Sequence, residues 1–291
     1  MSLSGLIRQH WAALRALLVL TAVVGIGYPL LIWAVAQLLG LRHNANGSII
    51  DVNGKPVASR LIGQLFTDAG GAPLPQYFQS RPSAAGSGYD PMVSGASNLG
   101  PESIIDAPGR PSLLTQVCAR SKAVGELEAV DGIRPFCTRD GVGAVLSVIG
   151  LRDARGRVPA PLRVVSLNQP CATTGKPFVD TYEGVRVECA KPDEDYSAGL
   201  IVPIRTAAPG ILAVPADAVT ASASGLDPHI SQVYADAQIA RVARTRGVRP
   251  EAVGDLVAAH TVGRALGFLG EPAVNVVTLN IALDETYPMT K

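Results

Sequence analysis

Residues 16–41 read ALLVLTAVVGIGYPLLIWAVAQLLGL and contain no charged side chain. At about 1.5 Å per residue, a helix of this length more than crosses a hydrocarbon core of about 30 Å. The stretch therefore predicts a transmembrane helix, with Trp11 and Trp33 as anchors at the interfaces. The run Ala34-Val35-Ala36 also fits the cleavage site of a signal peptide, but the apolar stretch is longer than a usual signal core.

The predicted membrane helix carries features that a simple anchor does not need. Pro29 follows Gly25 and Gly27 inside it, which predicts a kink or a freed carbonyl group that a neighbouring helix satisfies. Small residues also allow close approach of a second helix, although the spacing is not GxxxG and ordinary membrane-helix glycines are the alternative. We expect these three residues to pack against a partner helix.

Composition limits what the remainder of the chain does. With 291 residues, the chain forms one or two folded units. A net charge of +1 and 17% charged residues give no broad positive field, which argues against a nucleic-acid partner. The mean hydropathy of +0.25 is high, but 30 Gly and 22 Pro cannot all lie in membrane helices. The excess hydropathy is therefore concentrated in the N-terminal stretch.

The four cysteines indicate which side of the membrane the domain occupies. They all follow the predicted span, and none has CxxC or HxxxH spacing, so a metal site is not expected. An even number fits two disulfides in an oxidising compartment, with residues 1–15 in the cytoplasm and the C-terminal domain outside. Basic residues on the two sides do not decide the orientation, and three pairings are open. The candidates are Cys118, Cys137, Cys171 and Cys189.

The segment after the span begins with loops and short strands over residues 42–112, followed by a helix from Ser112 to about Glu128. β-Branched runs between Gly and Pro clusters indicate a β-rich unit over residues 131–210, which holds three of the cysteines.

Two helices follow this β-rich unit, one from Ser231 to a stop at Gly247 and one from Pro250 to His260. The β-branched run Val274 to Leu283 predicts a final strand.

Few patterns in the chain point to chemistry. Walker A, GxGxxG, GxSxG and HExxH motifs are absent. The Gly/Ser/Asn loop Ser94–Gly100 has the composition of an anion-binding loop or a plain turn. Asp227 and His229, with His260 elsewhere, offer a carboxylate and imidazoles, but helix capping and a hydrogen-bonded core histidine explain them as well. We expect the chain to have no catalytic residue of its own.

Several stretches together resemble one family, the C subunit (KdpC) of the Kdp-type potassium-transporting P-type ATPase. Their order along the chain, rather than any one of them, makes the resemblance specific. They are Gly27–Leu30, Asn44–Ser48, Leu61–Phe66, Tyr77-Phe78, Arg81–Ala84, Ser94–Gly100, Val219–Ile230, and the end from His260 to Leu283 with Gly267–Pro272 and Val274–Val276.

The resemblance implies an accessory subunit of a high-affinity, ATP-driven potassium uptake pump in the cell (inner) membrane. Its implied partners are a channel-like potassium-binding subunit, a P-type ATP-hydrolysing subunit and a small membrane peptide, besides membrane lipid. The family's implied role is chaperone-like, raising the catalytic subunit's affinity for ATP. The predicted topology separates an external domain from cytoplasmic ATP by about 30 Å of hydrocarbon. We therefore expect that the chain binds no cofactor of its own and meets ATP only through the pump complex.

Departures from the family define the predicted domains. Ala96 replaces a usual glycine, Val262 replaces a frequent acidic residue, and the β-rich stretch resembles an insertion. The expected architecture is one N-terminal transmembrane helix followed by an extracytoplasmic α+β domain, residues 42–130 and 211–291, which carries the cysteine-containing insertion 131–210.

The family-like loops supply the candidate residues for binding or partner contact. These residues are Ser94, Gly95, Ser97, Asn98, Gly225, Asp227 and His229. The alternative interpretation is a membrane-anchored extracytoplasmic enzyme or binding protein, which would leave the membrane in detergent without companions.

Overall fold

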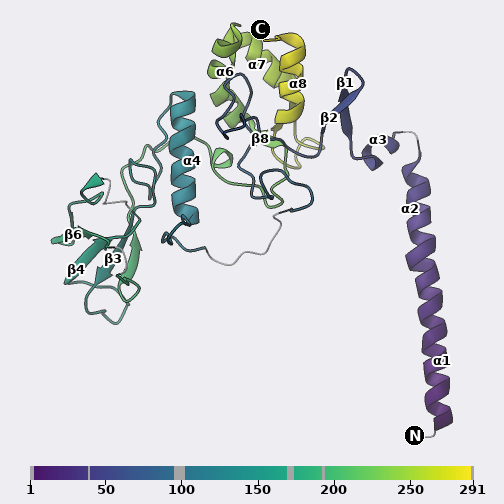
Figure 1. Ribbon diagram of the computed structural model, residues 1–291, viewed down its shortest axis with the longest axis horizontal. Coiled ribbons are helices and arrows are strands. Elements are labelled where there is room, and N and C mark those ends of the chain that lie inside the picture. Colours follow the sequence, from purple (N-terminus) through teal and green to yellow (C-terminus); the bar gives the residue numbers. More distant parts are fainter. Residues whose placement is uncertain (1–2, 39, 95–101, 169–173, 192–193, 290–291) are drawn as a thin grey trace. The chain divides into compact units, whose positions relative to one another are not determined.

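The computed structural model describes residues 3–38, 40–94, 102–168, 174–191 and 194–289. The chain divides into two compact units, Met1–Leu61 and Ile62–Lys291. The first contains a long helix and a small hairpin, and the second combines helices with two sheets (Figure 1). This mixture of helix and sheet agrees with the expected α+β class.

One helical segment among the described residues, Ser4–Ala36, is long and apolar enough to cross a membrane. It comprises α1 (Leu3–Leu20), a π-helix (Thr21–Gly27) and α2 (Tyr28–Ala36). The helix ends at Ala36, before Leu41, the expected limit, and Gly40 within the expected range has φ +92°, which a right-handed helix does not allow. The uncharged run therefore overestimates where the helix ends.

The π-helix lies directly before Pro29, where the sequence predicts a disturbance. Proline has no N–H, so it cannot donate the α-helical hydrogen bond to the carbonyl of Gly25, four residues earlier. The Tyr28 N–H instead bonds to the carbonyl of Val23, five residues earlier. The disturbance takes the form of a widened turn, a feature often found at functional positions in helices.

A short helix and a hairpin complete the first unit. Helix α3 (Arg42–Ala45) is followed by strands β1 (Ile49–Val52) and β2 (Lys55–Ser59), which pair antiparallel. Asn53 and Gly54 between them have φ +54° and +75°, the conformation of a type I′ turn. The short strands expected after the membrane segment are present.

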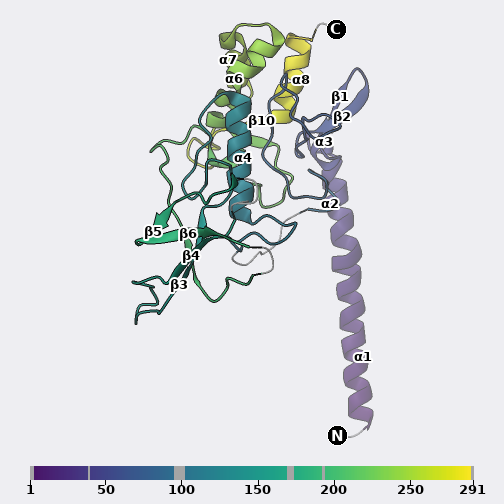
Figure 2. The same cartoon turned by 60° about the vertical axis from the view of Figure 1, so that its left-hand side comes forward.

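Helices enclose the main core of the second unit. They are α4 (Leu113–Glu128), the 3₁₀-helix η2 (Ala216–Ala218), α6 (Gln232–Arg246), α7 (Pro250–Ala259) and α8 (Val276–Thr286). Figures 1 and 2 show α6, α7 and α8 side by side. Phe78, Ile230 and Leu279 are among the side chains fully buried between these elements.

The predicted helix starts are confirmed by their caps. The Ser112 hydroxyl accepts the Thr115 N–H at 3.2 Å, and the Ser231 hydroxyl accepts the Tyr234 N–H at 3.1 Å. Gly247 ends α6 in the left-handed conformation at φ +68°. These bonds satisfy backbone donors and acceptors that a helix end would otherwise leave without partners.

The strand predicted over residues 274–283 is wrong. Only Ala273–Asn275 (β10) is extended, pairing with β8 (His229–Ser231) and β9 (Thr261–Val262), and α8 begins at Val276. The Asn275 side chain accepts the Thr278 N–H at 3.1 Å and caps the helix. Helical spacing then buries an apolar face, so tertiary packing overrides the β-propensity of this run. The fully buried side chains include Val276, Leu279 and Leu283.

The β-rich stretch forms a five-stranded sheet in the order β5-β6-β4-β3-β7. Only β4 and β6 run parallel. The strands contribute to a separate cluster of buried apolar side chains, which includes Leu146, Val148 and Val164. The strands are β3 (Val145–Ile149), β4 (Arg163–Ser166), β5 (Thr181–Tyr182), β6 (Val185–Cys189) and β7 (Leu200–Pro203).

A disulfide connects α4 to the chain that leads into this sheet. Cys118, on α4 as expected, pairs with Cys137, with their Cα atoms 5.5 Å apart. Cys189 at the end of β6 is also disulfide-bonded, whereas Cys171 lies outside the described residues. The disulfide prediction is confirmed for the first pair, which the sequence left as one of three possibilities.

Candidate functional site

Three family-like stretches that are far apart in sequence meet around residues 222–229, which we call the 222–229 segment. The Ser83 hydroxyl donates to the Gly225 carbonyl at 2.6 Å, and the Gly63 N–H donates to the Leu226 carbonyl at 2.9 Å. From the third stretch, the Ser94 hydroxyl donates to the Ser224 carbonyl at 3.1 Å. The fold thus brings candidate residues from two separate stretches together.

Close backbone approach explains the glycines at this junction. Gly225 has φ +71°, and a Cβ atom there would lie 3.0 Å from Ala85. A Cβ atom on Gly63 would lie 2.2 Å from the ring of Tyr89, well inside contact distance. Both positions therefore require glycine for the segments to meet.

A charged cluster stands on one side of the segment. The Arg81 guanidinium lies 3.7 Å from one Asp227 oxygen and donates to the Ala221 carbonyl at 3.2 Å. The other Asp227 oxygen accepts the His229 N–H at 3.0 Å and lies 2.9 Å from its Nδ1. The hydrogen bond from the His229 side chain is the main cause that lowers the pKa of Asp227, against the opposing effect of partial burial.

Tyr89 supports this cluster through two hydrogen bonds. It adopts φ +57°, unusual for a residue with a side chain, and its hydroxyl donates to the Arg81 carbonyl at 2.8 Å. Its N–H donates to the Ser83 hydroxyl at 2.8 Å. Burial raises its pKa to about 12, so the ring stays neutral and serves as packing rather than as an acid or base.

The hydrogen bonds show what the 222–229 segment can do chemically. The Ser222 hydroxyl accepts the N–H groups of Gly225 and Asp227, and the Ser224 hydroxyl accepts that of Leu226. These N–H groups donate to serine hydroxyls of the segment itself, so they are not available to bind an external phosphate. Over the described part of the chain, no group of three or more His, Cys, Asp or Glu side chains is arranged to hold a metal ion.

The expected role of Asp227 in starting a helix is corrected by the structure. Ser231 caps α6 itself, and the Ser231 N–H and hydroxyl both donate to Asp217 rather than to Asp227. Asp227 instead joins Arg81 to His229. His260 is the C-cap of α7 with Nδ1 2.9 Å from the Leu256 carbonyl, but it is only partly buried and is not a core residue.

The sequence did not single out Arg81, Ser83 and Tyr89 as site residues, although Arg81–Ala84 lies in a family-like stretch. Contacts over more than 130 positions of sequence are not visible in local patterns. Gly95, Ser97 and Asn98 lie outside the described residues.

Gly25 and Gly27, the candidate packing residues of the N-terminal helix, have room for a side chain within the helix itself. A Cβ atom on Gly25 would lie 3.8 Å from Thr21, and one on Gly27 would lie 3.6 Å from the Ala22 carbonyl, both ordinary contacts. Larger side chains at these positions are therefore compatible with the helix alone. None of the most apolar window of this helix is buried within the chain.

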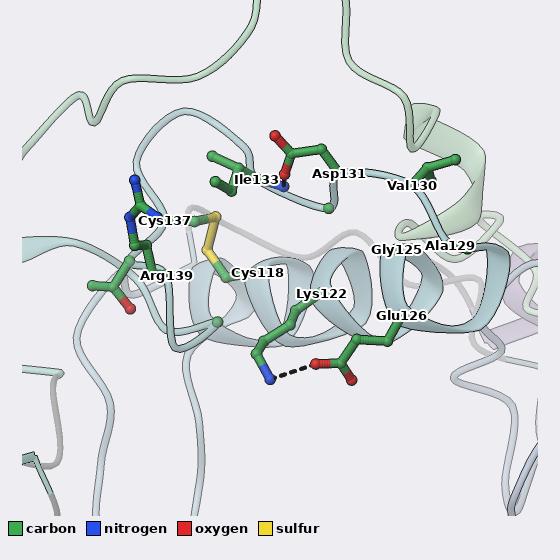
Figure 3. A pocket seen from close by; sticks show the side chains of 13 residues that line it. Cys118, Lys122, Gly125, Glu126, Ala129, Val130, Asp131, Ile133, Cys137 and Arg139 are labelled. Atoms are coloured by element: carbon green, nitrogen blue, oxygen red, sulfur yellow. Dashed lines mark hydrogen bonds and ion pairs between the residues drawn. A yellow bond between two sulfur atoms is a disulfide. The ribbon is translucent and has the colours of Figure 1, made fainter.

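A cavity of about 330 Å³ lies beside the Cys118–Cys137 disulfide (Figure 3). Two charged residues on its wall, Lys122 and Glu126, form an ion pair at 2.8 Å. An oxygen of Asp131 accepts the Ile133 N–H at 2.9 Å. Because these polar groups already have partners, we assign no chemistry to the cavity.

Comparison with known families gives an independent view of the chain. The family model described as "KdpC: K+-transporting ATPase, c chain" matches residues 10–131 and 198–285. The 222–229 segment and residues 10–36 of the candidate membrane helix lie within the matched residues, whereas residues 132–197 lie outside them.

Three relatives, each named potassium-transporting ATPase KdpC subunit, resemble the chain over nearly its whole length. The protein from Kineococcus radiotolerans is 39% identical over 288 residues, 99% of both chains. That from Koribacter versatilis is 35% identical over 271 residues, 93% of this chain and 91% of its own. That from Myxococcus xanthus is 36% identical over 276 residues, 94% of this chain and 87% of its own.

Proposed function

The chain belongs to the KdpC family and is thus an accessory subunit of a potassium-transporting ATPase, and we propose that it contributes to the pump by assembling and stabilising the complex. It assembles through its membrane helix with a channel-like potassium-binding subunit, a P-type ATP-hydrolysing subunit and a small membrane peptide. The external domain stabilises that assembly and does no covalent chemistry of its own.

The membrane helix is the observation that carries this proposal. Its glycines are unnecessary for the chain's own packing, and the π-helix before Pro29 changes the surface that it presents. In lipid, helices associate by close packing, because lipid tails are as apolar as leucine. A helix shaped in this way fits a subunit that packs against other membrane helices better than a simple anchor.

We propose that the N-terminus is cytoplasmic and that the domain of residues 42–291 is extracytoplasmic. The disulfides support this orientation, because such bonds persist in oxidising compartments. The test uses Ile211→Cys, at a side chain that is 91% exposed, and Ser4→Cys near the other end. An impermeant maleimide should label the first and not the second in sealed right-side-out cells. Labelling of Ser4→Cys alone would reverse the orientation.

We propose further that the subunit raises the ATP affinity of the catalytic subunit indirectly, through the assembled complex. The N–H groups of Gly225, Leu226 and Asp227, which donate to serine hydroxyls of their own segment, support an indirect role. We propose that the candidate residues form a partner-contact region rather than a nucleotide site. They are Ser94, Gly95, Ser97, Asn98, Gly225, Asp227 and His229.

The test compares ATPase activity against ATP concentration for pump purified with and without this subunit, together with photo-crosslinking by an azido-ATP. The expected result is a higher KM for ATP without the subunit and crosslinking to the catalytic subunit alone. Specific, competable crosslinking of this chain would contradict an indirect role.

A further inference from the structure

Residues 150–162 connect β3 to β4, and we call them the β3–β4 tip. Hydrogen bonds hold a turn within this tip in place. The Asp153 N–H donates to the Arg157 carbonyl at 2.8 Å, and the Gly156 N–H donates to the Asp153 carbonyl at 2.9 Å. The Asp153 carboxylate accepts the N–H groups of Arg155 and Arg157, both at 2.9 Å. These bonds lower the pKa of Asp153 and fix the turn before any partner arrives.

The tip is also anchored to the sheet. Val158 is 7% exposed and packs with the buried cluster that includes Leu146 and Val164. A Cβ atom on Gly150 would lie 2.7 Å from Val158, so glycine at this position lets the tip fold back over the strand end. The residues beyond Val158 are therefore held in place rather than free to collapse onto the core.

Two leucines at the ends of this connection remain in solvent despite that anchoring. Leu151 is 87% exposed and Leu162 is 80% exposed. The backbone holds the second in place, since its N–H donates to the Ile149 carbonyl at 2.9 Å. Exposed apolar side chains on a rigid element are available to a partner without further ordering.

Positive charge accompanies the leucines. Residues 150–162 contain three arginines and one acidic residue, a net charge of +3 − 1 = +2. Asp153 is engaged by Arg157 at 2.9 Å, whereas Arg152 makes one bond, to the Gly199 carbonyl at 3.3 Å. The Arg155 guanidinium makes no hydrogen bond or ion pair within the described part of the chain. Two guanidinium groups therefore remain available to an external anion.

We propose that the β3–β4 tip docks on anionic phospholipid headgroups of the bilayer that the chain's own N-terminal helix spans. Leu151 and Leu162 enter the interface, while Arg152 and Arg155 bind phosphate groups. Apolar insertion combined with basic residues is the pattern of interfacial membrane binding. Anchorage of the chain by its N-terminal helix favours lipid over a soluble partner, because it raises the effective concentration of the tip at the membrane.

This inference rests on the proposed anchorage by the helix but not on assembly with the pump. The tip lies outside the residues that the family model matches, 10–131 and 198–285. Docking and assembly are therefore expected to be lost independently of each other.

Each basic side chain near an anionic surface strengthens binding about fivefold, so two contribute about 30-fold.

The experiment measures the depth of a single tryptophan in the full-length chain. Trp11→Phe and Trp33→Phe remove the native tryptophans, and Leu162→Trp introduces a reporter at the tip. Ile211→Trp is the matched control at another exposed apolar position. Each variant is placed in nanodiscs of brominated phosphatidylcholine, with or without phosphatidylglycerol, and quenching by the brominated acyl chains is recorded.

The expected result is strong quenching of the tryptophan at 162 in discs that contain phosphatidylglycerol, and weak quenching of the control at 211. Arg152→Gln with Arg155→Gln should reduce the ratio of docked to undocked chain about 30-fold. Equal, weak quenching at both positions would overturn the proposal. Burial of the reporter only after pump assembly would also overturn it, in favour of a partner subunit. Co-purification of pump subunits, measured on the same variants, should remain unchanged.

Discussion

The buried ion pair between Glu128 at the end of α4 and Arg241 on α6 provides the sharpest stability prediction. The two side chains are 1% and 3% exposed, and both carboxylate oxygens accept from the Arg241 Nε at 3.0 Å. The same guanidinium also donates to the carbonyls of Pro75 and Tyr77 and to the Gln238 side chain. One pair thus joins two helices and the segment before Phe78.

Replacing Glu128 by Gln should lower the free energy of unfolding by about 3–5 kcal/mol, because it leaves a buried guanidinium without a counter-charge. That is a large share of the 5–15 kcal/mol typical of a domain. Burial raises the pKa of Glu128 against the opposing effect of Arg241, so desolvation is a substantial cost of the pair. Joint replacement, Glu128→Leu with Arg241→Met, should therefore cost less than the sum of the single changes.

The assay is guanidinium denaturation of the full chain in detergent, followed by near-ultraviolet circular dichroism. Glu126→Gln, on the same helix, is the matched control, since Glu126 pairs with Lys122 at the surface, where the two side chains are 66% and 46% exposed. Loss of such an exposed pair costs about 0.3–0.5 kcal/mol. A Glu128→Gln variant as stable as the Glu126→Gln variant would show that the Glu128 charge does not stabilise the fold.

Three further outcomes are expected. Gly25→Leu with Gly27→Leu should lower the amount of assembled pump and potassium uptake while leaving the circular dichroism of the domain after the helix unchanged, whereas leucines at positions 24 and 26 should have little effect. Unchanged assembly in the glycine variant would show that these glycines do not pack against a partner helix. Cys118→Ser with Cys137→Ser should lower the free energy of unfolding by about 3 kcal/mol, the chain-entropy value for a loop of 19 residues, as measured by denaturation. Potassium uptake should persist, and its loss in a well-expressed variant would contradict this expectation. Asp227→Asn should destabilise the chain at neutral pH. Because the pKa of Asp227 is lowered in the folded state, the difference in unfolding free energy between wild type and variant should vanish as the pH falls from about 3.9, the ordinary pKa of aspartate, through the lower folded-state pKa. A difference that does not depend on pH would exclude the carboxylate charge as its cause.

Local signals predicted the elements whose ends are fixed by local bonds. Ser112, Ser231 and Gly247 mark helix limits through their own side chain or backbone conformation, so the sequence placed α4 and α6 correctly. The run after Ala273 did not follow this rule, because its helix depends on burial against distant residues. β-Branched composition alone favoured a strand there, and the Asn275 cap was the only local signal against it.

The candidate site was only partly predictable for the same reason. Asp227 and His229 were found as neighbours in sequence, but Arg81 reaches them across the fold. The pairing of Cys118 with Cys137 likewise depends on how the chain after α4 returns along the helix. Local patterns carry no information about such returns, whereas the family resemblance predicted which segments matter without saying how they meet.

Purification of the intact, affinity-tagged chain from its native membrane in mild detergent shows whether the chain is a subunit of a potassium pump. The companions are identified by mass spectrometry, and ATP hydrolysis of the eluate is measured with and without potassium. We expect a stable complex with a polytopic potassium-binding subunit and a P-type ATPase, and ATP hydrolysis that potassium stimulates. Elution of the chain alone, from membranes that contain those subunits, would contradict a role as a pump subunit.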